Sequence, residues 1–331
     1  MYDLKIVGGT IVDGSGKNRY AGDVGIRDGL ICALGRCDEG SKETLDAEGA
    51  IVSPGFVDIH THYYGQVSWD EDLAPSSLHG VTTCAMGSCV VGLAPVRPAD
   101  RERLVELMEG VDDIPGSALS EGIRWGWESF EQYMEALDRL PHSIDFLTQV
   151  PHDALRVYVM GERAVYDERA SEEDIAQMRG LLRRALLAGA AGFSTGRTDN
   201  HRSAAGDWTP SAEAGAEELR GIVSAFEGLG HGVLQAVSDF NVLHGDEHFE
   251  PEWELLEQML RGADGRPMSI STLQRDHSPE QWRWILERAS NCVEQGFDLR
   301  CQVGARAIGV MLGLEATFHP FMGFPSYKAI S

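Results

Sequence analysis

The sequence lacks any apolar run that approaches the roughly 18 residues needed to span a bilayer, so we expect no membrane-spanning segment. Its first residues, Met1 to Lys5, lack the charged and then apolar pattern of a signal peptide, and we expect a cytoplasmic protein. Basic residues are scarce: 28 Lys and Arg stand against 52 Asp and Glu, a formal net charge of -24. A surface of this sign repels phosphate backbones, so we expect no nucleic-acid partner.

A dense cysteine framework is also absent. The six cysteines are dispersed through 331 residues, so we expect reduced thiols. No G-x-G-x-x-G motif follows an apolar run, which weakens a nucleotide-binding sheet as an alternative. The apolar fraction of 43% is nevertheless enough to bury a sizeable core, and the length allows one large catalytic domain with a smaller appendage.

Short β-branched runs joined by turns fill residues 1–52. Asp13-Gly14 and Asp28-Gly29 stand between such runs, and Asp-Gly pairs in this position are typical of turns in antiparallel hairpins. We therefore predict a small β module over residues 1–52, separate from the domain that follows.

Residues 53–331 show a rhythm of apolar strand, polar loop and amphipathic helix. The clearest helix spans Ser171 to Leu187, where Ser171 and Asp174 predict a capping box and Gly189 a stop. Alternating strands and helices imply a parallel sheet. Seven units fit an α/β, TIM-like (β/α)8 barrel that is truncated before strand eight. The expected strands are 51–59, 81–86, 144–150, 190–193, 233–237, 268–273 and 299–303.

His60 and His62 follow the first expected barrel strand. Residues two apart in a strand point the same way, so both imidazoles should project together at the carboxyl end, where such barrels hold their active sites. Two neutral imidazoles suit a zinc-class ion. The alternative is a pair of polar histidines at a strand end. An apolar strand leads directly into the two histidines after the Pro54-Gly55 turn, and this context favours the interpretation as a metal site.

The segment 51–62 (IVSPGFVDIHTH) resembles the signature of the amidohydrolase superfamily, and segments 6–14 and 23–29 resemble its N-terminal β-sandwich segment. Within the superfamily the chain is most similar to the N-acyl-D-amino-acid deacylases (D-aminoacylases), through 87–89 (GSC), 125–130 (WGWESF) and 189–196 (GAAGFSTG). The resemblance implies a metal-dependent hydrolase of linear amide bonds, with one or two divalent ions such as Zn²⁺. The expected reaction is deacylation of a small N-acyl-D-amino acid by a metal-activated water.

The resemblance also implies that Cys89 takes the bridging position which other amidohydrolases give to a carboxylated lysine on strand four. Strand four here, 192–196, has no lysine. A buried cysteine that only fills space is the alternative. The family places metal-binding histidines on strands five and six, where this chain has Gln235 and Thr272. Either the site is mononuclear or it has drifted from hydrolytic chemistry.

The family's general base is an aspartate at the end of strand eight. We expect that residue to lie beyond Ser331, so no catalytic residue is assigned and the fragment alone is expected to be inactive. Candidate substrate-binding residues are His152 after strand three, Gln235 on strand five and Arg275 after strand six. A guanidinium suits a substrate carboxylate. Solvated loop positions are the alternatives for His152 and Arg275.

Two other functions stay open from the sequence. One is a cyclic-amide hydrolase of the hydantoinase or dihydroorotase type, which the missing strand-four lysine opposes. The other is a non-catalytic barrel that binds a small ligand or a partner subunit. Loss of the two histidines favours that alternative, whereas retention of His60, His62 and Cys89 opposes it. The oligomeric state is left open.

Overall fold

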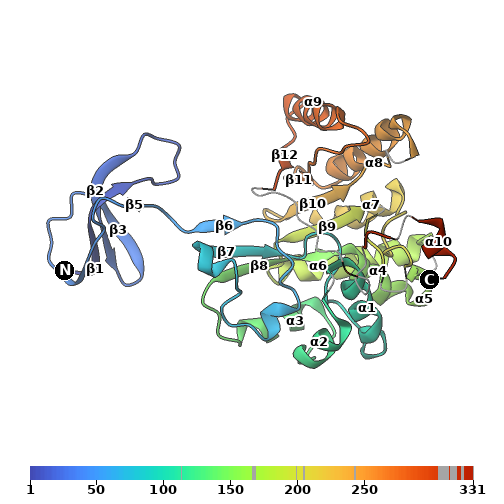
Figure 1. The fold of residues 1–331 in the computed structure, drawn as a ribbon, viewed down its shortest axis with the longest axis horizontal. Coiled ribbons are helices and arrows are strands. Elements are labelled where there is room, and N and C mark those ends of the chain that lie inside the picture. Colours follow the sequence, from blue (N-terminus) through green and yellow to red (C-terminus); the bar gives the residue numbers. More distant parts are fainter. Residues whose placement is uncertain are drawn as a thin grey trace. The chain divides into compact units, whose positions relative to one another are not determined.

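The computed structural model describes residues 1–112, 114–165, 169–198, 200–203, 206–241, 244–304, 313, 319–321 and 324–330. The chain divides into two compact units, Met1–Val57 with Gly80–Thr82 and Asp58–His79 with Thr83–Ser331. One sheet lies within the smaller unit, and most of a second, seven-stranded sheet lies within the larger unit together with the helices (Figure 1). Among the described residues, no helix has both the length and the apolar character required to cross a bilayer.

The smaller sheet has the strand order β3-β2-β1-β4, and β5 also pairs with β1. As the turn signals predict, β1 pairs antiparallel with β2, and β2 with β3. Asp28 and Gly29 connect β2 to β3 with φ values of 51° and 74°, the left-handed pair that a tight hairpin turn requires. The strands are β1 (Tyr2–Ile11), β2 (Tyr20–Arg27), β3 (Leu30–Gly35), β4 (Ser41–Asp46) and β5 (Ile51–Val52).

The larger sheet follows the chain order without a crossover, β12-β11-β10-β9-β8-β7-β6, and its neighbours from β7 to β12 are parallel. It is a curled half-barrel, consistent with the α/β prediction (Figure 1). The strands are β6 (Phe56–Asp58), β7 (Val81–Met86), β8 (Asp145–Pro151), β9 (Gly192–Arg197), β10 (Val233–Ser238), β11 (Met268–Ser271) and β12 (Leu299–Gln302).

The first apolar run, expected as a single strand over 51–59, is divided in the structure. Its beginning, β5, joins the smaller sheet through β1, and β6 starts only at Phe56. Pro54 lies in the interval and has no N–H to give to a ladder, which explains the interruption. One apolar run therefore supplies strands to both sheets.

Helices follow most strands of the larger sheet. The prediction for 171–187 is confirmed: α6 (Glu172–Leu187) begins after Ser171, which forms a capping box with Asp174, and its apolar face is buried. The other helices are α1 (Arg101–Asp112), α2 (Gly116–Gly122), α3 (Phe130–Asp138), α4 (His152–Met160), α5 (Glu162–Val165), α7 (Ala216–Val223), α8 (Phe249–Gly262), α9 (Gln281–Glu294) and α10 (Pro325–Lys328). Short 3-10 turns are η1 (Gln66–Ser68), η2 (Ser77–His79), η3 (Pro98–Asp100), η4 (Ser224–Phe226) and η6 (Asp246–His248).

Strand β9 separates two environments because its side chains alternate between the two faces of the sheet. Phe193 and Thr195 both contact His152 at the start of α4, so they face the helices. Ser194, between them, donates a hydrogen bond to the carbonyl of Gly87 on the opposite face. Gln235 is the register partner of Ser194 and shares that opposite face.

Candidate metal centre

The two histidines lie in the loop that follows β6, beyond the end of the strand at Asp58. Thr61 sits between them, and both its N–H and its hydroxyl donate to the carbonyl of Ala85 on β7, at 2.9 and 2.7 Å. Because Thr61 is fixed on one side, His60 and His62 project to the other. Their rings are stacked, with centroids 5.6 Å apart and planes 13° from parallel. The expected projection to one side is therefore seen, although a loop and not a strand produces it.

Cys89 lies in a tight segment after β7. Gly87 has a φ of 82°, and a Cβ added there would lie 2.4 Å from the carbonyl oxygen of Gln149. Cys89 and Val90 also have positive φ, 56° and 73°, which is costly for a residue with a side chain and rare for a β-branched one. At Gly196 on β9 an added Cβ would lie 2.3 Å from Val90 Cγ2. The strained segment that carries Cys89 and Val90 therefore packs directly against Gly196 of β9.

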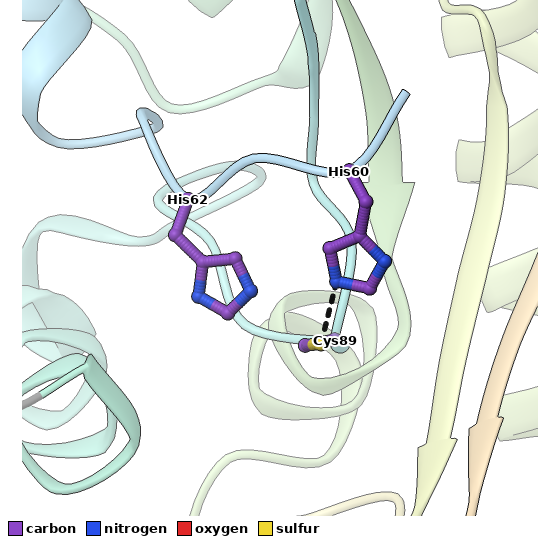
Figure 2. Close-up of side chains that lie close together, drawn as sticks. All are labelled: His60, His62 and Cys89. Carbon is purple, nitrogen blue, oxygen red and sulfur yellow. Dashed lines mark hydrogen bonds between the residues drawn. The ribbon is translucent and has the colours of Figure 1, made fainter. Parts of the chain in front are cut away.

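These elements bring His60, His62 and Cys89 together. One ligand atom from each residue lies within 4.8 Å of the others, and His60 Nε2 is 3.0 Å from Cys89 Sγ. Figure 2 shows both rings turned with a nitrogen toward the sulfur. The thiol is 8% exposed, so it is shielded from bulk water.

The charges around the thiol favour its ionised form. Burial by itself would raise the pKa of Cys89, but the charge of His62 and the hydrogen bond with His60 outweigh it and hold the pKa well below its usual value. Burial acts to lower the pKa of His62, yet the charges of Asp112 and Cys89 raise that pKa well above its ordinary value. A thiolate beside two imidazoles is a donor set suited to a borderline-soft cation of the zinc class.

Two residues that the sequence analysis missed lie behind the imidazoles. His60 Nδ1 donates to Gln302 Oε1 at 2.7 Å, and His62 Nδ1 donates to Asp112 Oδ1 at 2.6 Å. Gln302 ends β12 and Asp112 ends α1. The position of Gln302 at the carboxyl end of a predicted strand is a signal that could have identified it. Nothing in the local sequence singles out Asp112, which carries the same acidic character as many surface residues of this chain.

His201 is a further residue near the centre that the sequence analysis did not select. It follows β9 at its carboxyl end, and its Nδ1 is buried without a hydrogen-bond partner among the described residues. Burial lowers the pKa of His201, and the charges of Cys89, His62 and Asp112 act on it. The general rule that polar residues after barrel strands face the active site would have found it.

Two candidate substrate residues, His152 at the start of α4 and Gln235 on β10, lie on opposite faces of the sheet. Gln235 is 1% exposed, and its Oε1 has no partner among the described residues. His152 is fully buried on the other face of the sheet, where its two ring nitrogens contact Thr195 Oγ1 at 3.0 Å and Glu218 Oε1 at 3.1 Å. The substrate-binding roles of Gln235 and His152 stay predictions, and the structure does not bring the two side chains together.

Arg275 follows β11 at its carboxyl end. Its guanidinium donates to two neutral oxygens, Gln281 Oε1 at 2.5 Å and the carbonyl of Ser238 at 2.9 Å. Burial lowers its pKa, while the charge of Asp239 raises it. The two hydrogen bonds hold the guanidinium in place through neutral acceptors, while the carboxylate of Asp239 supplies a nearby opposite charge. The role of Arg275 in binding a substrate carboxylate stays a prediction.

Comparisons with known proteins find similar sequences and structures among deacylases. The D-aminoacylase of Alcaligenes xylosoxydans xylosoxydans is 32% identical over 219 residues, which are 66% of this chain and 40% of that protein. A crystal structure of D-aminoacylase superposes with a TM-score of 0.74 and 27% identity over 93% of this chain and 60% of that one. The N-acyl-D-glutamate deacylase of Bordetella bronchiseptica, solved with zinc and a phosphonate inhibitor, gives a TM-score of 0.69 at 25% identity, covering 91% of this chain and 58% of that one.

This chain therefore spans less than two thirds of the length of these relatives, and only 40% of the first. The family model described as the amidohydrolase family matches residues 43–322, which include the loop after β6, the segment after β7 and the whole of the larger sheet. On this match the chain belongs to the amidohydrolase family.

Proposed function

We propose that this chain carries the metal-binding part of a hydrolase for linear amide bonds, with an N-acyl-D-amino acid as substrate. His60, His62 and Cys89 would hold one zinc-class ion at the mouth of a (β/α)8 barrel of which the described sheet forms seven strands. The small β module would be the β-sandwich segment of such an enzyme. The observation that carries the proposal is the convergence of three donors of the right type within 4.8 Å.

The residues present fit a cation. The thiol is buried and its pKa is lowered, so it is ready to bind as a thiolate. Each imidazole donates a hydrogen bond from Nδ1, His60 to Gln302 and His62 to Asp112. Because Nδ1 of each ring keeps its proton, a cation would displace only the proton on the Nε2 side that faces the thiolate, and Nε2 would then supply its lone pair. A bound divalent ion lowers the pKa of water and polarises a scissile carbonyl, which is the chemistry that amide hydrolysis requires.

Substrate recognition would use the charge of Arg275. A carboxylate of an N-acyl amino acid can accept from a guanidinium that neutral acceptors already orient. Zinc in the N-acyl-D-glutamate deacylase and the names of both deacylase relatives support this substrate class. A cyclic-amide substrate is less favoured, because β9 presents Ser194 and Thr195 and has no lysine.

Metal analysis with a matched histidine control tests the proposal. The purified chain is expected to bind about one zinc per chain, measured by mass spectrometry of the metal. His60→Ala should lose the zinc, whereas His79→Ala, an exposed histidine before β7, should retain it. Release of free D-amino acid from N-acetyl-D-amino acids is the activity to measure in the protein that contains this chain. Retention of zinc by His60→Ala would contradict the assignment.

One geometric observation favours a second candidate. Cys89 Sγ, His60 Nε2 and Gln302 Oε1 form a chain of contacts of 3.0 and 2.7 Å, as in a thiol nucleophile with an imidazole base and an orienting amide. In such a reaction the thiolate attacks the amide carbonyl, the amine leaves with a proton from His60, and water hydrolyses the thioester.

Chelation separates the two candidates. If the site works through a metal, treatment with a chelator abolishes hydrolysis and added zinc restores it. If Cys89 is the nucleophile, hydrolysis survives the chelator, and mass spectrometry detects an acyl group on the peptide that contains Cys89.

A further inference from the structure

The carboxylate of Asp112 occupies a position that its own helix disfavours. Asp112 is the last residue of α1, where the helix dipole is negative, and its side chain is only 4% exposed. A carboxylate at a helix C-terminus is destabilised by the dipole, and burial adds to the cost. Such a placement needs a compensating partner, and the described contacts of Asp112 show which one it has.

That partner is His62. Asp112 Oδ1 accepts from His62 Nδ1 at 2.6 Å and from the hydroxyl of Tyr64 at 3.4 Å. The other oxygen, Oδ2, is buried without a hydrogen-bond partner among the described residues. The segment is fixed further by Tyr133, whose hydroxyl donates to the carbonyl of Tyr64 at 3.0 Å. The short contact to His62 is therefore the main polar interaction of a buried carboxylate.

This contact decides which nitrogen of His62 is available. A carboxylate can only accept, so the proton of the neutral ring must lie on Nδ1, and Nε2 keeps its lone pair. In Figure 2 the second ring nitrogen of His62 points toward Cys89. The carboxylate also raises the basicity of the ring, so Nε2 becomes a stronger ligand for a cation.

His60 has a similar arrangement with a different partner. Its Nδ1 donates to the amide oxygen of Gln302, which accepts a hydrogen bond but carries no charge. The two imidazoles of the centre are thus backed by one charged and one neutral acceptor. They are not equivalent ligands.

We propose that Asp112 is a positioning residue that orients His62 and makes it the stronger of the two imidazole ligands for a divalent cation. This inference rests on the proposed metal site. It adds a residue from α1, outside the strands and the loops that carry the ligands, and it assigns unequal strengths to His60 and His62.

Cobalt titration of the chain tests the role of Asp112 apart from catalysis. Co²⁺ bound by a thiolate gives a charge-transfer absorption band, so the band reports both affinity and the presence of Cys89 in the site. In Asp112→Asn, which keeps the shape of the side chain and removes the charge, we expect Co²⁺ affinity to fall by roughly 10- to 100-fold. Asp112→Glu, which restores the charge at a shifted position, should regain part of the loss.

Asp138→Asn is the matched control, because Asp138 is also the last residue of a helix, α3, but is exposed. It should bind Co²⁺ as the unmodified chain does. Thermal unfolding of the metal-free variants identifies any that fail to fold. If Asp112→Asn is one of them, the smaller variant Asp112→Ser takes its place, and a Co²⁺ affinity and spectrum equal to those of the unmodified chain would overturn the role.

The outcomes separate the inference from the function on which it rests. Tight binding by both the unmodified chain and Asp112→Asn overturns the role of Asp112 and leaves the metal site intact. Failure of the unmodified chain to bind Co²⁺ or Zn²⁺ overturns the metal site itself, and the inference with it.

Discussion

His60 Nδ1 and Gln302 Oε1 are 2.7 Å apart although 242 residues separate them in the sequence. His60 follows β6 and Gln302 ends β12, and these two strands stand at opposite ends of the strand order. In a flat sheet, six spacings of about 4.8 Å would hold the outer strands roughly 29 Å apart. A direct hydrogen bond between residues at the two ends therefore requires the sheet to curl, and the candidate metal centre depends on that curvature.

Replacing Cys89 with serine should remove the cation. The hydroxyl of serine is a far weaker ligand than a thiolate, so zinc affinity should fall by more than the roughly 10- to 100-fold that changes behind the ligands cause. Cys84→Ser is the matched control: Cys84 is also buried, but burial raises the pKa of its thiol to about 11, which marks it as an unreactive interior residue. Isothermal titration with zinc measures the affinities of both variants. If Cys89→Ser binds zinc as tightly as Cys84→Ser does, Cys89 is not a ligand.

Adding one methyl group to β9 should disturb the thiol. In Gly196→Ala the new Cβ would lie 2.3 Å from Val90 Cγ2, and relief of this overlap must move the segment that carries Cys89. We expect a loss of about 1–3 kcal/mol in the free energy of unfolding, together with weaker zinc binding. Urea denaturation and zinc titration provide the two readouts.

Two further variants check the cause of that effect. Val90→Ala in the Gly196→Ala background removes the overlapping methyl groups and should restore zinc binding. Gly180→Ala in α6 meets no atom within 4 Å and should instead stabilise the chain by about 0.5–1 kcal/mol. A Gly196→Ala protein with normal stability and zinc affinity would show that the contact between β9 and the segment is unimportant.

Asp174 should stabilise the chain in a pH-dependent manner. Partial burial acts to raise its pKa, but hydrogen bonds from Arg163 and Ser171 outweigh this and hold the pKa at about 2. Because the folded-state pKa lies below the ordinary value of 3.8, the stabilising contribution of Asp174 is fully present above about pH 4 and is lost as the pH falls through about 2. Asp174→Asn should cost about 1–2 kcal/mol at pH 7, measured by urea denaturation.

The difference between Asp174→Asn and the unmodified chain should narrow as the pH is lowered from 4 toward 2. Glu172→Gln, in the same helical turn but exposed, is the control and should change stability little. A difference that stays constant across this range would mean that the carboxylate charge of Asp174 has no part in the cap.

Asp153 should change the stability of the chain with pH in the opposite direction to Asp174. Burial raises its pKa to about 7, even though the backbone N–H of Ser211 donates to Oδ1 at 2.7 Å. The folded state therefore holds the proton more strongly than the unfolded state, and stability should fall as the pH rises from about 4 to about 7. Asp153→Asn mimics the protonated carboxyl and should remove this slope, with a gain on the order of 2 to 4 kcal/mol above pH 7.

Unfolding curves collected between pH 4 and pH 8 test the role of Asp153. Asp145→Asn, at the exposed start of β8, is the control and should leave the slope as it is. If Asp153→Asn is less stable than the unmodified chain at pH 8, the carboxylate must be ionised and satisfied by contacts in the folded state.

Sequence predicts best the features that depend on neighbours along the chain. The capping box of Ser171 and Asp174 and the turn at Asp28-Gly29 are such features, because their hydrogen bonds and dihedral angles are set within a few residues. The two histidines also belong here, since one intervening residue fixes their relation. The apolar runs also locate the strands from β7 to β12, although their predicted ends differ from the observed ones by up to a few residues.

The partners of those histidines could not be predicted in this way. Asp112 and Gln302 reach the centre only because α1 packs near the loop after β6 and because the sheet curls, and both relationships are properties of the folded chain. The division of the run 51–59 was missed for a related reason. Pro54 marks the break within the run, but the pairing of Ile51 and Val52 with β1 depends on where β1 lies in the folded chain.

The attachment of Thr61 to Ala85 makes the centre sensitive to chain length. Its two hydrogen bonds fix the register of the loop, and the imidazoles flank it at equal distance along the backbone. Inserting one residue between Thr61 and His62 would reverse the direction of the second imidazole and separate it from both Asp112 and Cys89. Homologous chains that keep both imidazoles in this position should therefore accept substitutions at the middle position of the motif far more readily than a deletion or an insertion.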